Sequence, residues 1–247
     1  TYAAHTWQGG LGMPDRDYYL NTDEKTVSTR EAYQAYVEKM ISMVNLPDVK
    51  MSVSLIMDLE TKLANIQMEK EKIKNESELY NMISADSLHL IMPNFNWNGY
   101  LEELDVEVNT LGQICICMVD YSKALNDIIV QTDIEVWKTF LKWKVINSSA
   151  WMLNEEICEH HFNFYNKQLK VYGIYSQSWL GGVKIVNDCL GDVVGKVYVE
   201  KHFQPVVKER IAQIIEYILV AFEESINNQE WLSKSTKEEA VKNNFYC

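Results

Sequence analysis

The segment QGGLGMPDRDYYL, residues 8–20, is the part of this chain that decides the fold. Its three glycines allow backbone angles that residues with a Cβ atom avoid, and Pro14 fixes one backbone angle and removes one amide donor. Asp15 is suited to cap a short helical turn over residues 16–19. The segment therefore predicts a tight turn that leads into helix, and we expect its residues to act as scaffold rather than to carry chemistry.

The composition around this segment is that of a mainly helical globular protein. The chain has 247 residues, enough for one large domain or two small ones, with 47% hydrophobic and 23% charged residues. Its 7 Trp, 14 Tyr and 7 Phe provide bulk for a core, and only 10 Gly and 4 Pro argue against an all-β fold with many turns. We therefore expect a mainly α multi-helix lobe with few or no strands.

The charge and the hydropathy exclude several classes of partner. A net charge of −12 would repel the phosphate backbone of nucleic acids and disfavour docking on anionic lipid. No apolar run approaches the ~20 residues of a membrane helix. The chain starts at Thr1 without a signal-peptide pattern, and we expect this start to be an internal cut that carries no information about the compartment.

Five cysteines are present, and they form no CxxC pair. In an extended segment, Cys115 and Cys117 would point to the face opposite Ile116, and the five are too few to define a disulfide framework. We favour free thiols. The cysteines are Cys115, Cys117, Cys158, Cys189 and Cys247.

Helical patterns follow the opening segment. Thr22 or Asp23 can cap a helix that runs to about Asn45, and a Leu-Pro-Asp break at 46–48 separates it from a second helix with apolar residues from Val53 to Ile66. Residues 70–78 form a charged connector. A weakly alternating stretch at 106–119 is the one strand-like connector. Further helices are expected at 121–130, 133–149 and 154–169.

The C-terminal part carries an amphipathic helix at 208–228, and its apolar side is expected to be buried. Before it, glycines at 181 and 182 would weaken a helix by ~1 kcal/mol each. After it, Ser233 is a good N-cap for a last helix. The apolar stripe consists of Ile211, Ile214, Ile215, Ile218, Leu219, Phe222 and Ile226.

The opening segment resembles the QGGLGLPDRDYYL signature of the neprilysin-like zinc metallopeptidases, and further blocks resemble the same family in order along nearly all of the chain. Two positions depart from the family pattern. Met82 stands where the family has Lys, and Leu180-Gly181 stands where two basic residues follow the Trp that corresponds to Trp179. The further blocks are LETKLA at 59–64, YNM to PNFNW at 80–97, the helix around 137–147, FNFY at 162–165, the VND to KHF block at 186–203 and WLSKSTK at 231–237.

In that family, two mostly helical lobes enclose a cavity, and a His-Glu-x-x-His helix in the C-terminal half holds zinc. The resemblance implies that residues 1–247 form one helical region of the closing lobe, with an opening turn at 1–20, a helical lobe at 21–203 and helices leading toward a catalytic lobe at 204–247. The parent protein would be a zinc-dependent endopeptidase, and this chain would restrict access to peptides of limited size.

No catalytic residue and no metal ligand of the family falls on a matched position, so we assign none and leave the substrate-binding residues unknown. The histidines contain no His-x-x-x-His pair, which a zinc hydrolase of this type needs. We expect no cofactor in this chain, zinc only in the parent enzyme, and no peptidase activity from the isolated chain.

The most tempting alternative is the segment EEICEHH at 155–161. Glu156 with His160, and Cys158 with His161, share helix faces, but two ligands on a face do not complete a four-coordinate site. We interpret the segment as a helix-surface patch with ordinary i,i+4 pairing.

Two other polar groups are expected to be structural. We expect His202 to pack rather than to bind a ligand, because the family usually has an aromatic residue there. Asp15 and Asp17 flank Arg16, which favours a local ion pair.

The expected partners are the catalytic C-terminal lobe of the same parent protein and, in the parent, peptide substrates, but neither nucleic acid nor a membrane segment of this chain. The resemblance favours an extracytoplasmic location, although some bacterial relatives are cytosolic. Two other hypotheses stay open: a stand-alone helical binding or interaction module, and a degenerate inactive relative. An uncovered apolar face over residues 193–203 and the following helix would favour the fragment interpretation.

Overall fold

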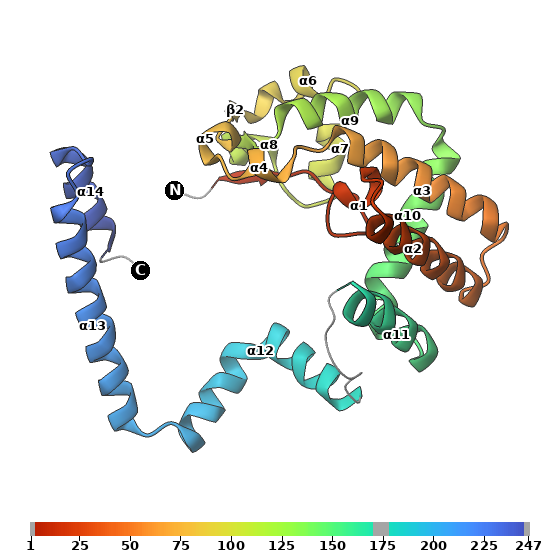
Figure 1. The fold of residues 1–247 in the computed structure, drawn as a ribbon. Coiled ribbons are helices and arrows are strands. Elements are labelled where there is room, and N and C mark those ends of the chain that lie inside the picture. The colour runs from red at the N-terminus through yellow and green to blue at the C-terminus, as the bar shows by residue number, and fades with distance from the viewer. Residues whose placement is uncertain (1–2, 170–177, 245–247) are drawn as a thin grey trace. The chain divides into compact units, whose positions relative to one another are not determined.

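The computed structural model describes residues 3–169 and 178–244, and it is mainly helical with one small sheet (Figure 1). This confirms the predicted fold class. The chain divides into two compact units, Thr1–Tyr175 and Ser176–Cys247.

Short elements and long helices alternate in the first unit. In order they are β1 (Ala4–Thr6), α1 (Asp17–Leu20), α2 (Glu24–Met43), α3 (Val49–Ile66), α4 (Lys70–Ile73), α5 (Glu76–Leu79), β2 (Met82–Ser84), the 3₁₀ turn η1 (Ala85–Ser87), α6 (Leu88–Ile91), α7 (Trp97–Glu102), α8 (Val108–Leu111), β3 (Gln113–Ile116), α9 (Val119–Gln131), α10 (Ile134–Ser149), the 3₁₀ turn η2 (Ala150–Met152), α11 (Glu155–Phe162) and the π-helical segment η3 (Asn163–Gln168).

Two of the long helices of this unit, α2 and α10, begin at capping residues. Asp23 caps α2 by accepting a hydrogen bond from the Thr26 amide, and Asp133 caps α10 in the same way through the Glu135 amide. The expected break after α2 is made with Asn45 and Asp48 in left-handed backbone conformations (φ 53° and 49°). These boundaries position α2, α3 and α10 around one core.

That core is aromatic and lies between α2, α3, α10 and η3, with the opening segment packed against it. Fully buried residues include Tyr33 on α2, Ile56 on α3 and Trp143 on α10. The ring of Tyr36 stacks on that of Phe164, from η3, at a centroid distance of 4.7 Å. Segments from both ends of the unit therefore share one core.

The sheet has the strand order β1-β3-β2, with β1 parallel and β2 antiparallel to β3. Its central strand lies inside the strand-like connector expected at 106–119, which confirms that prediction for β3, but the same stretch also contains α8, and the strands β1 and β2 were not expected. Ile114 and Ile116 pack in one cluster, with Leu88, whereas Cys115 and Cys117 pack in another. The alternation predicted for the two cysteines is therefore confirmed.

Two local expectations need adjustment. The charged connector at 70–78 contains the single-turn helices α4 and α5. The helix expected over 154–169 begins after Asn154, which caps it through the Ile157 amide, but it widens to a π-helix at Asn163. Such a widening commonly accompanies a functional or packing constraint, and here it sets Phe164 and Tyr165 against α2.

The second unit consists of α12 (Ser178–His202), α13 (Pro205–Asn228) and α14 (Lys234–Asn244). Helix α12 continues through both glycines at 181 and 182 and has non-helical angles at Leu190. Ser233 accepts a hydrogen bond from the Thr236 amide, as its predicted role as N-cap requires. In this unit α14 packs on α13, and Lys237 donates to the carbonyl of Asn227 at 2.7 Å.

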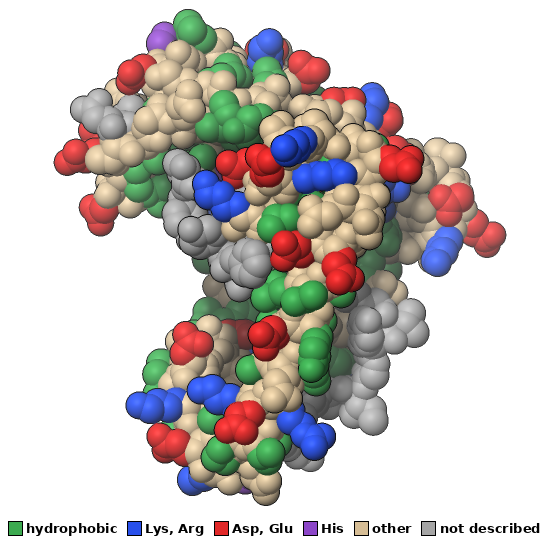
Figure 2. Space-filling view, turned by 90° about the vertical axis from the view of Figure 1, so that its left-hand side faces the viewer, with side chains coloured by type: hydrophobic (Ala, Val, Ile, Leu, Met, Phe, Trp, Pro, Cys, Tyr) green, Lys and Arg blue, Asp and Glu red, His purple; other side chains and the backbone are tan. Residues whose placement is uncertain are grey.

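The prediction of a buried apolar stripe on α13 is wrong for most of its length. Ile214 and Ile218 are 56% and 60% exposed, and of the stripe only Ile226, near α14, is buried. An amphipathic helix buries its apolar face only where another element lies against it. The companion prediction, of uncovered apolar residues over 193–203 and the following helix, is confirmed by the exposure of residues such as Val193 and Tyr198. Hydrophobic side chains lie beside charged ones on the molecular surface (Figure 2).

Among the residues that the structure describes, no helix is both long and apolar enough to cross a membrane.

Candidate functional site

The opening segment is tied to the end of α3 and to α9 by hydrogen bonds from its first residues. The side chain of Gln8 donates to the carbonyl of Met68 and accepts from the Met68 amide, at 3.2 and 2.7 Å. The carbonyl of Gly9 accepts from the side chains of Gln67 and Tyr121, at 2.9 and 3.1 Å. These bonds satisfy the backbone of a segment without regular structure, which explains why it is ordered.

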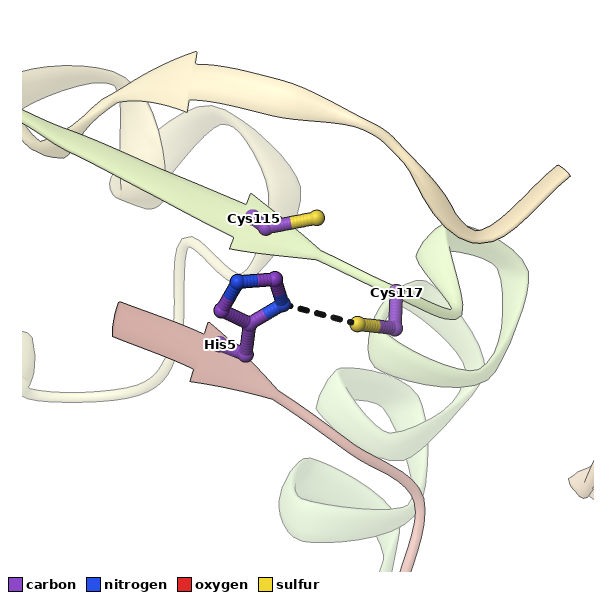
Figure 3. A group of neighbouring side chains, drawn as sticks. All are labelled: His5, Cys115 and Cys117. Carbon is purple, nitrogen blue, oxygen red and sulfur yellow. Dashed lines mark hydrogen bonds between the residues drawn. The ribbon is translucent and has the colours of Figure 1, made fainter. Parts of the chain in front are cut away.

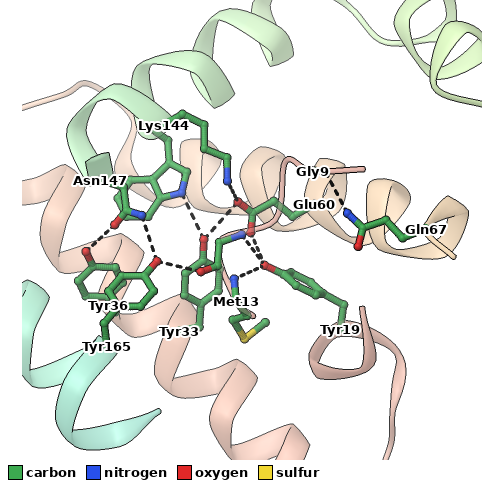
Figure 4. A network of polar contacts seen from close by, with 12 residues as sticks. Gly9, Met13, Tyr19, Tyr33, Tyr36, Glu60, Gln67, Lys144, Asn147 and Tyr165 are labelled. Carbon is green, nitrogen blue, oxygen red and sulfur yellow. Dashed lines mark hydrogen bonds and ion pairs between the residues drawn. The ribbon is translucent and has the colours of Figure 1, made fainter. Parts of the chain in front are cut away.

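A buried carboxylate lies beneath the turn. The hydroxyl of Tyr19 accepts from the amides of Gly12 and Met13, both at 3.0 Å, and donates to Glu60 at 2.6 Å (Figure 4). Glu60 has no exposed surface and also accepts from Tyr33, at 3.2 Å. A buried carboxylate requires such donors because it has lost its hydration.

The positive charge that balances Glu60 comes from α10. Lys144 lies 3.1 Å from the Glu60 carboxylate, and one turn later Asn147 binds two phenols. The hydroxyl of Tyr36 donates to Asn147, which donates to Tyr165, at 2.7 and 3.0 Å. Tyr165 in turn donates to the carbonyl of Gly12 at 2.9 Å. The polar network thus returns to the turn from which it started (Figure 4).

The absence of a side chain at Gly12 is a condition for this arrangement. A Cβ atom there would lie 1.8 Å from the hydroxyl of Tyr33. Gly10 has φ +93°, a conformation that residues with a Cβ rarely adopt. Gly12, predicted as part of a turn, therefore also leaves room for the hydroxyl of Tyr33.

The phenols of the network are protonated donors at neutral pH. Burial, reinforced by the charge of Glu60, raises the pKa of Tyr19 and of Tyr33 far above the usual value for tyrosine. Burial also raises the pKa of Tyr36, and that of Tyr165 to about 12. Protonated phenols can hold and orient a turn but cannot act as bases, which supports a scaffold role for the opening segment.

The expectation of a helix-surface patch at 155–161 is wrong for its histidines. His160 stacks on Tyr36 at a centroid distance of 5.1 Å, and Nδ1 of His161 lies 2.8 Å from the Tyr36 hydroxyl. Glu156 pairs instead with Lys39 of α2, at 3.7 Å. The helix turns this face toward α2, and burial lowers the pKa of both histidines.

The four possible ligands Glu156, Cys158, His160 and His161 therefore do not converge. The thiol of Cys158 donates to the carbonyls of Ala150 and Leu153, at 3.2 and 3.4 Å, and so points back to the preceding turn. His202 is exposed and lies against Tyr198 at 5.0 Å between ring centroids, so it contacts an aromatic residue on its own helix.

The expected ion pair of Arg16 with its neighbours is also wrong. Arg16 donates to the carbonyl of Gln67 at 2.8 Å and lies 3.8 Å from Glu69. Asp15 pairs with Lys70 at 2.7 Å and accepts from the Asp17 amide at the start of α1. The turn directs these side chains toward the segment after α3, so their ionic partners are distant in sequence.

One group of possible metal ligands was missed from the sequence: His5, Cys115 and Cys117, whose ligand atoms all lie within 4.8 Å of one another (Figure 3). The pairing of β1 with β3 brings these three residues together. Patterns within a few residues of the sequence do not predict this pairing. The only available signal was two cysteines at strand spacing. Both thiols are free, as are Cys158 and Cys189, in agreement with prediction, while Cys247 lies outside the described residues.

With this geometry established, the chain can be compared with known proteins. The sequence model for the N-terminal part of peptidase family M13 matches residues 1–243, which is nearly the whole chain. The chain belongs to peptidase family M13. The blocks that suggested a neprilysin-like protein were therefore interpreted correctly.

Individual M13 relatives agree with this assignment. Endothelin-converting enzyme 1 of Rattus norvegicus is 27% identical over 237 residues, which cover 94% of this chain and 31% of that protein. Neprilysin-11 of Caenorhabditis elegans is 25% identical, with 94% and 28% covered. The chain thus spans about a third of the length of the curated M13 relatives that it matches.

Solved M13 structures have the same fold over the matched region. The zinc metalloprotease Zmp1 of Mycobacterium tuberculosis, in complex with an inhibitor, superposes with a TM-score of 0.83 at 26% identity and covers 96% of this chain and 36% of its own. PepO of Lactobacillus rhamnosis, at 17% identity, shares the fold with a TM-score of 0.75.

Proposed function

We propose that this chain is the non-catalytic, cavity-closing part of a zinc-dependent metalloendopeptidase. The observation that carries the proposal is the match of residues 1–243 to the N-terminal part of the M13 family. The names of two relatives support the reaction class, because membrane metallo-endopeptidase-like 1 and the zinc metalloprotease Zmp1 are peptidases by name. The catalytic lobe is the partner that this function requires.

The residues of this chain do not fit the family's zinc site. A catalytic zinc site of this kind needs two histidines four residues apart on a helix and a third protein ligand. The five histidines of the sequence include no such pair. When zinc is bound in the parent enzyme it activates water for peptide hydrolysis, and no step of that chemistry is assigned to the residues described here.

The role left to this chain is to shape and close the substrate cavity. The network around Glu60 supports this role, because it makes a rigid unit out of segments that are far apart in sequence. The exposed apolar faces of α12 and α13 support it as well, since a large uncovered apolar surface is typical of an interface. We propose that the catalytic lobe covers these faces, and that the enzyme acts outside the cytoplasm on peptides small enough to be enclosed.

The test compares the isolated chain with the product of the complete reading frame. We expect the full product to carry a His-Glu-x-x-His motif downstream and to cleave peptides, with activity lost on chelation and restored by zinc. We expect the isolated chain to be inactive on the same peptides. A reading frame without that motif, or a full product that binds peptides without cleaving them, would favour a stand-alone module or an inactive relative.

A further inference from the structure

The three strands of the small sheet align a set of soft metal ligands on one face. His5 on β1 is the register partner of Cys115 on β3, and Met82 on β2 is the partner of Cys115 on the other side. Residues that are paired across strands project to the same face. Cys117 follows Cys115 by two residues and packs in the same cluster. This face therefore carries an imidazole, two thiols and a thioether.

The distances suit a single ion. Nδ1 of His5 lies 3.7 Å from Sγ of Cys117, and the ligand atoms of all three residues lie within 4.8 Å of one another. In a tetrahedral site with Zn–S near 2.3 Å and Zn–N near 2.0 Å, neighbouring ligand atoms are roughly 3.5–3.8 Å apart. One edge of the triangle already has this length, and the widest separation requires side-chain movement of about 1 Å or less.

The surroundings favour a thiophilic ion over a hard one. Both thiols are buried, and they pack with Met118 and Tyr121 in an apolar cluster to which Met82 also contributes. Thiolate and thioether ligands select Zn²⁺ and Cu⁺, whereas Mg²⁺ and Ca²⁺ require oxygen ligands. His5 is exposed, so an ion can enter from its side.

The thiols of Cys115 and Cys117 bind a metal ion as thiolates, so the ion must replace their protons. Burial, with a contribution from Cys115, raises the pKa of Cys117. The thiol of Cys115 donates to the carbonyl of Leu79 at 3.3 Å. Binding would release both thiol protons and exchange this hydrogen bond for a metal–sulfur bond.

We propose that His5, Cys115 and Cys117 form a binding site for one thiophilic d¹⁰ cation of the Zn²⁺ and Cu⁺ class, with Met82 or water in the fourth position. The bound ion links β1 to β3. Because β1 leads directly into the segment 8–20, the ion fixes the start of the chain where it enters the core. The inference does not rest on the proposed function. It runs against the sequence-based expectation of no metal in this chain.

The test is a titration of the reduced, metal-free 247-residue chain with Cd²⁺, Zn²⁺ and Cu⁺. Cd²⁺ bound to thiolates absorbs in the near ultraviolet, so binding and ligand type are measured together. We expect saturation at one equivalent, protection of Cys115 and Cys117 from alkylation in a mass-spectrometric assay, and a higher melting temperature with metal. Competition between Zn²⁺ and Cu⁺ then shows which ion the site prefers.

Variants identify the ligands. His5→Gln, Cys115→Ser and Cys117→Ser should each weaken binding by more than the roughly 10- to 100-fold that is typical when a residue hydrogen-bonded to a metal ligand is lost. His5 is exposed, so its substitution tests the site without disturbing the core. The double variant Cys158→Ser/Cys189→Ser, which removes thiols outside the cluster, and His89→Gln should bind as the unmodified chain does.

Two results would overturn the proposal. The first is an equal rate of alkylation of Cys115 and Cys117 with and without metal. The other is one-to-one binding that survives His5→Gln and either cysteine substitution but is lost in the Cys158→Ser/Cys189→Ser control. The first would show that the cluster binds no ion, and the second that the ion is bound elsewhere.

Discussion

Lys144 of α10 lies 3.1 Å from Glu60 of α3, a carboxylate with no exposed surface. The two residues are 84 positions apart in sequence. Their pair joins α3 and α10 at the point where both helices meet the opening turn. Because Glu60 is also bound by Tyr19 and Tyr33, it organises the donors that hold the turn. This relationship gives the first prediction.

Lys144→Met should destabilise the first unit by about 3–5 kcal/mol, the usual cost of leaving a buried charge without its partner. Lys138→Met is the matched control, because Lys138 lies on the same helix in an exposed pair with Glu135 and its loss should change stability little. Chemical denaturation followed by far-ultraviolet circular dichroism measures both. Adding Glu60→Gln to Lys144→Met should recover part of the loss, and a double variant no more stable than Lys144→Met would contradict the charge-based explanation.

Gly12→Ala should destabilise by about 1–3 kcal/mol, the range for overpacking a core, because the new methyl group would occupy the position of the Tyr33 hydroxyl. Moving Tyr33 would also break its bonds to Glu60 and Trp143. Gly9→Ala is the control, since no neighbouring atom lies within 4 Å of its added Cβ. Equal melting temperatures for the two variants would show that the turn adapts.

Stability should fall as the pH drops through the ordinary imidazole range. Burial lowers the pKa of both His160 and His161, and the charge of His160 also lowers that of His161. As the pH falls, the unfolded chain therefore binds protons on these two histidines at a higher pH than the folded chain does. The loss therefore begins near the unfolded pKa of about 6.5 and is complete below the folded values. The groups that face them include Tyr36, Tyr165, Lys39 and Glu156.

His161→Gln should flatten this dependence, by at most about 1.4 kcal/mol per pH unit for one proton. His89→Gln, at an exposed histidine, is the control variant for the loss of an imidazole elsewhere. Denaturation midpoints measured between pH 5 and pH 8 provide the comparison. Parallel pH profiles for the unmodified chain and His161→Gln would mean that His161 does not titrate differently on folding.

Ile218→Asp would destabilise the chain by several kcal/mol if the stripe of α13 were buried. Ile218 is 60% exposed, so we expect an almost unchanged melting curve but weaker self-association and weaker binding of a hydrophobic dye. Gln213→Asp adds the same charge at an exposed position on the same helix and should preserve both properties. Sedimentation and dye fluorescence are the measurements, and a large fall in melting temperature would mean that the stripe is buried in solution.

Much of the secondary structure was readable locally. Asp23, Asp133 and Ser233 cap helices through bonds that span two or three residues, and such bonds depend on the neighbouring sequence alone. The alternation around Cys115 predicted the strand β3 for the same reason. The widening of α11 into η3 was not readable, because the packing of Phe164 and Tyr165 on α2 accompanies it and no local pattern reports that packing.

The sequence by itself determined the helical class and, through ordered blocks, membership of the M13 family. Only the tertiary structure decided the partners of each polar group: Arg16 with Glu69, Glu60 with Lys144, and His5 with Cys117. It also decided that the stripe of α13 is largely uncovered. Propensity, capping and periodicity act over a few residues, whereas ion pairing and burial depend on which distant segments meet in space.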